Sequence, residues 1–181
     1  MNIFFLSISP QEAARMMCDK HVVKMILELC QMLWTAFHST GEDQWKELVP
    51  AEMKIYRATH ANHPTCVWVR SSSTNYKWAA EHALEISKEY TRRYGKIHAC
   101  HLMAEWFTRH SPRCDCEDKT QAVYATKDIP DGCTPAPLCI TNSEYHRDSL
   151  VESYRVYYIK DKIRFAKWDK SNNTPDWFLK G

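Results

Sequence analysis

The chain has 181 residues, of which 44% are hydrophobic and 25% charged, and its formal net charge is +2. This length and composition suit one domain, residues 1–181, that buries a core without disulfide support. The net charge is too small to indicate nucleic-acid binding by itself, and no apolar run is long enough to span a bilayer, so no membrane partner is expected. The start of the chain lacks a basic leader and a cleavage site, and it does not predict a signal peptide.

Helical patterns dominate the first third of the chain. Asn2–Ile8 favours β structure and predicts a short amino-terminal strand, after which Ser9 and Pro10 suit the cap and the first position of a helix. From Pro10 to His38 apolar residues recur every three or four positions, which predicts one long helix or two abutting ones. A further helix, interrupted at its proline, is expected over Trp45–Thr59.

A second helical region precedes an irregular one. A short helical turn is expected over Thr65–Arg70, followed by an amphipathic helix that Ser71–Thr74 can cap and Gly95 can close. Arg109–Asn142 contains four prolines and four cysteines and shows little periodicity. We expect an irregular segment near 110–142, of a kind that often shapes substrate sites.

The last clear helix begins at Ser143 or Asp148 and runs through Tyr158. The expected fold class is therefore mainly α, a single-domain helical bundle with a short amino-terminal strand and one irregular segment.

One candidate site lies within the first helical pattern. His21, Lys24 and Glu28 are spaced by three and then four residues, so they share one helical face. Such a polar stripe faces either solvent or a cleft, and the spacing does not decide which. In a cleft, a carboxylate beside an amine and an imidazole can manage proton transfer around a sugar C1′ or an imine.

Two further groups suit nucleic acid. The turn Tyr56–Pro64 and the residues after it are dense in polar and aromatic side chains, although Asn62 and His63 can equally serve as helix caps. Near the end of the chain basic residues alternate with aromatic ones, which suits a phosphate backbone with stacked bases; a solvated tail with core aromatics explains the pattern equally well. The basic members are Lys160, Lys162, Arg164, Lys167 and Lys170.

The eight cysteines are expected to be reduced thiols, because Cys18 and Cys30 lie inside helical patterns and no export signal is predicted. A reducing, cytoplasmic location follows, which includes the host cell of a virus or phage. No cofactor is expected. Several side chains have the types found at structural zinc sites but lack paired spacing, so zinc is the weaker interpretation: His98, Cys100, His101, His110, Cys114, Cys116 and Cys133.

Three stretches carry a resemblance to a known family. "EAARMMCDKHVVKMILELCQML" resembles the amino-terminal helix of the phage endonuclease V family of pyrimidine-dimer DNA glycosylases, in which a catalytic glutamate follows a histidine by seven residues, as Glu28 follows His21. "NHPTCVWVRSSSTNYKWAAEHALEISKEYTRRYG" is similar to the second long helix of that family, and "NNTPDWFLKG" to its aromatic carboxyl terminus. The motif "CDKHVVKM" is closer still to uncharacterised viral and phage proteins.

The resemblance implies a glycosylase with lyase activity that acts on DNA. An amine attacks C1′, the base leaves, and an imine permits β-elimination, with Glu28 assisting. The nucleophile of the family is a processed amino-terminal threonine, whereas this sequence begins with Met1 and Asn2, so the amine of Met1, Lys20 or Lys24 takes that role or the lyase step is absent. The first helix is also poor in arginine. Another pyrimidine lesion or a modified viral base therefore fits as well as a dimer.

The expected catalytic residues are Glu28, His21, Lys24, Met1 and Asn2. The expected substrate-binding residues are Lys20, Arg57, His60, Asn62, His63, Trp68, Arg70, Asn75, Tyr154, Lys160, Lys162, Trp168 and Trp177. Two alternatives stay open: a non-catalytic DNA- or protein-binding module of the same fold, and an enzyme that modifies nucleobases or nucleotides. The sequence leaves the oligomeric state undetermined.

Overall fold

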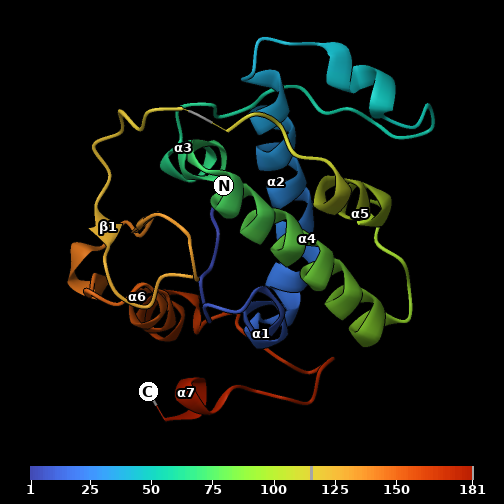
Figure 1. Cartoon of the computed structure of the whole chain (residues 1–181). Helices are drawn as coiled ribbons and strands as arrows, with labels where there is room; N and C mark the ends of the chain where they lie inside the picture. Colours follow the sequence, from blue (N-terminus) through green and yellow to red (C-terminus); the bar gives the residue numbers. More distant parts are fainter. Residues whose placement is uncertain (115, 181) are drawn as a thin grey trace.

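A computed structural model describes residues 1–114 and 116–180, and it is mainly α-helical (Figure 1). Asp115 and Gly181, which belong to the expected irregular segment and tail, lie outside the described residues. The helices are α1 (Pro10–Met16), α2 (Asp19–His38), η1 (Gln44–Leu48), α3 (Pro64–Ser71), α4 (Ser73–Tyr94), α5 (His101–Arg109), η2 (Ser143–Tyr145), α6 (Leu150–Tyr157), η3 (Tyr158–Lys162) and α7 (Asp176–Leu179). Two short strands, β1 (Tyr124–Ala125) and β2 (Ala136–Pro137), pair antiparallel. The expectation of a mainly α fold is confirmed.

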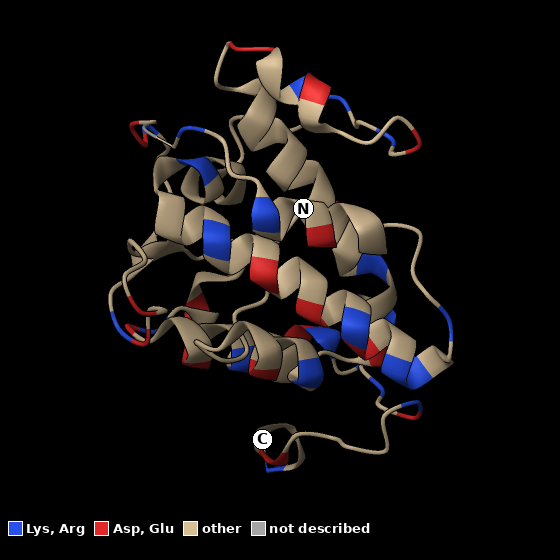
Figure 2. Ribbon diagram, turned by 45° about the vertical axis from the view of Figure 1, so that its right-hand side comes forward, with Lys and Arg blue, Asp and Glu red and all other residues tan. Residues whose placement is uncertain are grey.

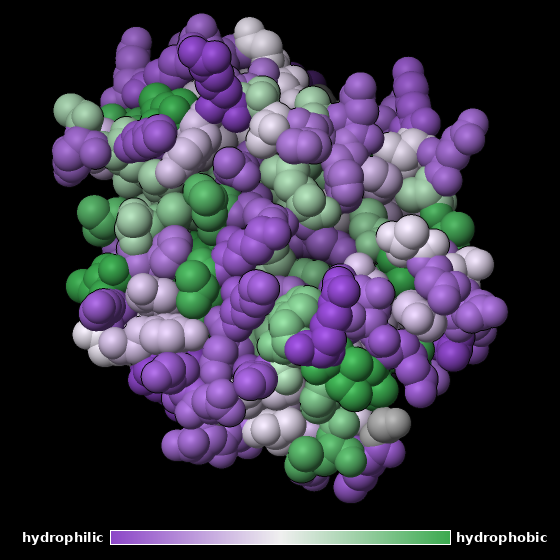
Figure 3. All heavy atoms as spheres, turned by 180° about the vertical axis from the view of Figure 1, so that it is seen from behind, coloured by the Kyte–Doolittle hydropathy of each residue, from purple (hydrophilic) through white to green (hydrophobic). Residues whose placement is uncertain are grey.

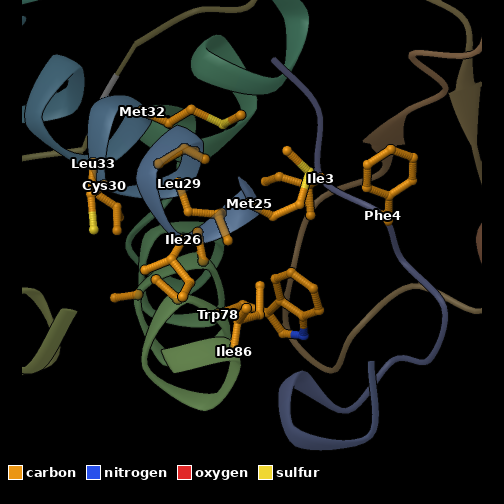
Figure 4. Packing of buried hydrophobic residues seen from close by; sticks show 14 of the residues in the cluster. Ile3, Phe4, Met25, Ile26, Leu29, Cys30, Met32, Leu33, Trp78 and Ile86 are labelled. Atoms are coloured by element: carbon orange, nitrogen blue, oxygen red, sulfur yellow. The ribbon is translucent and has the colours of Figure 1, made fainter. Parts of the chain in front are cut away.

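The bundle is organised around α4, which packs against α1, α2, α3 and α5 (Figure 1). Ser72 caps its first turn by accepting from the backbone N–H groups of Thr74 and Asn75, and Gly95 ends it in the left-handed conformation with φ 64°. Cap and closing glycine lie where the sequence predicts them. The apolar face of α2 completes this core, and Figure 4 shows Met25, Ile26 and Leu29 directed toward the other buried side chains.

The pattern from Pro10 to His38 forms two abutting helices. Met17, with φ −63° and ψ 142°, and Cys18 are extended and separate α1 from α2. Ser9 accepts from the N–H of Glu12 and Pro10 stands at the first helical position, as expected.

The predicted strand at Asn2–Ile8 is wrong. The segment is extended and its residues from Ile3 to Ser7 are buried, but no strand lies beside it in the described part of the chain. Side chains of the helices satisfy its backbone instead: Arg155 donates to the carbonyl of Leu6 and Trp78 Nε1 to that of Ile8. The segment is thus a buried, extended stretch of chain between helices (Figure 4).

The predicted helix at Trp45–Thr59 is also wrong, since η1 alone is helical there. Pro50 has no N–H to donate and stops the helical turn, and the chain then runs irregularly to α3. Helix α5, by contrast, is an addition that the sequence analysis missed. Its signal was the spacing of Met103, Trp106 and Phe107, all of which are buried.

The last predicted helix, α6, begins at Leu150 with Ser149 as its cap, just after the later of the two expected starts, while Ser143 begins the short helix η2. Among the described helices, none combines the length and apolarity needed to cross a bilayer. On the face that Figure 3 shows, hydrophilic side chains predominate and hydrophobic ones form separate patches.

Candidate active site

A pocket of about 500 Å³ lies where the start of the chain, α2 and the last third of the chain meet. It brings together eight of the residues that the sequence singled out: Met1, Asn2, Lys20, His21, Lys24, Glu28, His63 and Lys162. Tyr157 and Phe165, which belong to the basic and aromatic pattern near the end of the chain, line it as well. Four more residues line it that sequence reasoning missed: Phe4, Met25, Cys139 and Thr141. The polar stripe on α2 therefore faces a cleft.

The carboxylate of Glu28 lies at the wall of this pocket and faces three nitrogen atoms. Oε1 lies 3.2 Å from Nζ of Lys24, one helical turn earlier. Oε2 lies 3.7 Å from the amino group of Met1 and accepts a hydrogen bond of 3.3 Å from the backbone N–H of Asn2. The side chain of Glu28 is 16% exposed and that of Lys24 is 67% exposed. The Glu28 carboxylate thus lies between the exposed amine of Lys24 and the amino group of Met1, whose side chain is buried.

His21 is a neutral group in this pocket. Its Nδ1 is hydrogen-bonded to the hydroxyl of Tyr158, and its ring stacks on Phe4 with 4.4 Å between centroids. Burial, assisted by the positive charges of nearby lysines, lowers the pKa of His21 from 6.5 to about 3. At neutral pH the imidazole therefore carries no charge, and it contributes packing and a hydrogen bond.

Lysines give the pocket its positive charge. Lys20, Lys24 and Lys162 line it together with a single carboxylate, that of Glu28, among the described lining residues. Lys20 lies 4.9 Å from the ring centre of Phe165, and Lys162 lies 4.2 Å from that of Tyr157. Ammonium groups beside aromatic rings suit an anionic ligand that carries a flat base. Elsewhere basic and acidic residues are mixed (Figure 2).

The thiol of Cys139 also lines the pocket, but it is a poor nucleophile. Burial raises the pKa of Cys139 to about 11, with hydrogen bonds to Thr65 opposing the shift. Because the thiolate is the reactive form, Cys139 is a weaker candidate nucleophile than the amines of the pocket.

His63 combines the two roles that the sequence left open. Its Nδ1 accepts from the backbone N–H of Thr65 at 3.3 Å, so it caps α3, and its ring also lines the pocket. Burial and the charge of the amino terminus lower the pKa of His63 below 6.5. On the other side of the same turn, Asn62 and Arg70 line a second pocket of about 870 Å³.

The other expected substrate-binding residues lie away from the main pocket. Trp68 and Asn75 are buried and bind Thr134 of the irregular segment, through Trp68 Nε1 at 3.1 Å and Asn75 Nδ2 at 2.7 Å. Trp168 is buried and donates to the carbonyl of Met16 at 3.0 Å. The remaining members are Tyr154, buried beneath Asn2, Trp177, half-buried against Tyr158, and the exposed residues Arg57, His60 and Lys160.

The basic and aromatic tail is anchored to the start of α2. Besides the Trp168 contact, the backbone N–H of Asp19 donates to the carbonyl of Lys167 at 2.8 Å, and the backbone N–H of Lys170 donates to the Asp19 carboxylate at 2.9 Å. Trp168 is thus a packing residue, while the lysines around it remain exposed.

Cys18 and Cys30 are buried thiols, as expected from their helical setting. Within the described residues, no group of three or more His, Cys, Asp or Glu side chains is placed to hold a metal ion.

A comparison with protein families places the chain. Residues 1–102, more than half of the 181, match the model of the pyrimidine dimer DNA glycosylase family. No curated protein and no solved structure matches the chain significantly. The matched region contains α2 with Glu28, α3 and α4. The chain therefore belongs to the pyrimidine dimer DNA glycosylase family.

Proposed function

We propose that the protein is a DNA glycosylase that removes a damaged or modified pyrimidine from DNA and then cleaves the strand by a lyase step. The observation that supports this most directly is the position of Glu28, whose carboxylate oxygens lie 3.2 Å from Lys24 Nζ and 3.7 Å from the Met1 amino group inside a lysine-lined pocket. An amine and a carboxylate in contact are the two groups that this chemistry needs.

The proposed reaction begins at the sugar. The amine, after giving up its proton to solvent, forms a bond to C1′ while the bond from C1′ to the base breaks, and the base leaves with the electron pair and takes a proton from water. A proton then moves from the new ammonium through Glu28 to the ring oxygen, which opens the sugar and leaves a protonated imine. Glu28 next accepts a proton from C2′, and the bond from C3′ to the phosphate oxygen breaks with its electron pair leaving on the phosphate.

The pocket suits an extruded nucleotide. A base that is to be processed must leave the stack, and aromatic side chains usually hold it there. Tyr157 and Phe165, which are both half-buried, supply such surfaces, and the volume of about 500 Å³ lies within the range of small-molecule sites. Lys20 and Lys162 are the proposed contacts to the flanking phosphates, and Lys162 would leave its pair with Asp161 to make one.

The amine of Met1 is the proposed nucleophile, with Lys24 as its alternative. The Met1 side chain is 4% exposed, so this end of the chain is confined at the carboxylate, whereas Lys24 is 67% exposed. Confinement favours attack from a fixed position. Trapping the imine with borohydride and mapping the modified peptide by mass spectrometry will identify the nitrogen. Base release without any covalent adduct would show that the protein is a glycosylase without the lyase step.

The central test is Glu28→Gln on duplexes that carry a pyrimidine dimer or one of a panel of modified pyrimidines. We expect base release to fall at least about 100-fold while the Kd for DNA stays within about threefold. Glu85→Gln is the matched control, since Glu85 pairs with Lys88 at 2.7 Å on α4 and is similarly shielded. It should leave both quantities unchanged.

Three results would overturn the proposal. If Glu28→Gln releases base at the wild-type rate, the carboxylate has no part in catalysis. If the wild-type protein binds these duplexes without releasing any base, it is a binding module. Activity on free nucleotides that exceeds activity on duplexes would indicate a nucleotide-modifying enzyme.

A further inference from the structure

The contacts that fix Asn2 come from a part of the chain beyond the family match, which ends at residue 102. Asn2 Nδ2 donates to the carbonyl of Cys139 at 2.9 Å, and the hydroxyl of Tyr154 lies 3.0 Å from Asn2 Oδ1. The backbone N–H of Cys139 in turn donates to the same hydroxyl at 3.3 Å. Asn2, Cys139 and Tyr154 thus form a closed ring of three hydrogen bonds, which we call the Asn2 ring.

Tyr154 anchors the Asn2 ring in the core, while Asn2 and Cys139 are half-buried and line the pocket. Tyr154 is fully buried, and its aromatic ring packs edge-on against Phe4 at 6.0 Å. Cys139 directly follows Leu138, whose backbone is bonded to Val123 next to the small sheet. The Asn2 carboxamide uses its oxygen and one N–H of Nδ2 in this ring, which fixes the orientation of the side chain.

The same residue carries the link to the carboxylate. While its side chain is held in the Asn2 ring, its backbone N–H donates to Glu28 Oε2 at 3.3 Å. The first residues of a chain fray unless something ties them down. The Asn2 ring supplies that tie one peptide unit away from the amino group that faces Glu28.

We infer that Tyr154 is a positioning residue for the site: acting through Asn2, it holds the start of the chain against Glu28, so residues 137–154 are a functional part of the active site. The sequence suggested that Tyr154 touches the substrate, but its burial places it one layer behind. The effect of Tyr154 on catalysis rests on the proposed function, whereas its effect on the position of Asn2 rests only on the contacts above.

The test is Tyr154→Phe, which removes one hydroxyl and keeps the ring. Tyr76→Phe is the matched control, since Tyr76 is equally buried and its hydroxyl donates to the carbonyl of His110 at 2.9 Å, away from the pocket lining. Hydrogen exchange of the Asn2 side-chain amide, measured by NMR, reports the ring without reference to activity. We expect exchange to accelerate about tenfold in Tyr154→Phe and to stay unchanged in Tyr76→Phe.

Single-turnover base release gives the second measurement. In Tyr154→Phe the rate should fall about tenfold while the Kd for DNA stays within twofold, because the change loosens the nucleophile and removes no DNA contact. Unchanged exchange at Asn2, or an unchanged rate in the folded variant, would overturn the inference. If Glu28→Gln keeps full activity, the proposed function fails, and the exchange measurement still decides whether the Asn2 ring exists.

A second pair of variants covers the case in which Tyr154→Phe does not fold. Asn2→Leu removes the other side of the ring, keeps a bulky second residue so that Met1 is retained, and should lower the rate to a similar extent. In the double variant the two losses should not add, since both break one structure. Fully additive losses, or a wild-type rate in Asn2→Leu, would contradict a role of Tyr154 through Asn2.

Discussion

The guanidinium of Arg93 in α4 donates to the carboxylate of Asp19, the first residue of α2, over 2.9 Å. The Arg93 side chain is fully buried and also donates to the carbonyls of Met17 and Arg15, at the break between α1 and α2. One charged group therefore fixes the end of one helix and the beginning of the next. Because the site residues of α2 follow directly, their direction into the pocket depends on this contact.

Replacing Arg93 by Met should lower the free energy of unfolding by about 3–5 kcal/mol, because the carboxylates of Asp19 and Glu89 lose their buried partner. Arg92→Met is the control, since Arg92 pairs with the same Glu89 from an exposed position and should cost less than about 1 kcal/mol. Urea unfolding measures both values. Equal losses would show that the burial of Arg93 has no energetic weight.

Acid should destabilise the fold through His82. This side chain is buried, and burial lowers the pKa of His82 from 6.5 to about 4, against the opposing hydrogen bond to the Pro10 carbonyl. The unfolded chain takes up a proton near pH 6.5 and the folded chain does not, so the full stability is present above pH 6.5 and is lost as pH falls toward 4.

His82→Asn removes this proton uptake and keeps an N–H for Pro10. Its free energy of unfolding should depend less on pH between 6.5 and 4, by up to about 1.4 kcal/mol per pH unit. Urea unfolding at a series of pH values tests this. An unchanged slope would mean that His82 titrates normally in the folded chain.

The lysines of the pocket should contribute to DNA affinity. Lys20→Ala and Lys162→Ala should each weaken binding and lower the slope of log K against log salt by about one. Lys127→Ala serves as the control, because Lys127, like Lys162, pairs with an aspartate but lies outside the pocket lining, and it should leave the slope unchanged. Fluorescence anisotropy between low and moderate salt gives these slopes. If all three variants keep the wild-type slope, the DNA does not bind at this pocket.

Gly95 should be sensitive to substitution for a backbone reason. Its φ is 64°, and no atom lies within 4 Å of the position that a Cβ would take, so the cost of Gly95→Ala comes from the left-handed conformation alone. We expect a loss of about 1 kcal/mol in unfolding free energy. Gly95→Asn should lose less, since Asn tolerates this conformation better. Thermal unfolding of the two variants provides the comparison.

Much of the helical core was predictable because its signals are local. The cap at Ser9, the periodic apolar residues of α2 and the closing Gly95 each act within a few residues, and each lies as the sequence predicts. The strand prediction for Asn2–Ile8 was wrong because its β-favouring residues are also those that fill a core. Whether a second strand pairs with this segment depends on tertiary packing, which no local sequence pattern contains.

The candidate site was partly predictable for the same reason. The spacing of His21, Lys24 and Glu28 places them on one face, and the family resemblance identified that face as important. Phe4, Cys139 and Thr141 could not be found this way, because they reach the pocket from segments over a hundred residues apart with no shared motif. Their position follows from how the irregular segment packs, which depends on contacts such as that of Asn75 with Thr134.

The walls of the pocket come from segments far apart in the sequence, so a ribosome makes them at different times. A ribosome that has released the first hundred residues has made Glu28 and Lys24 but neither Tyr157 nor Phe165. At that stage the carboxylate has no enclosure and no aromatic surface to hold a base. The proposed site is therefore incomplete in the nascent polypeptide until the residues as far as Phe165 have been synthesised.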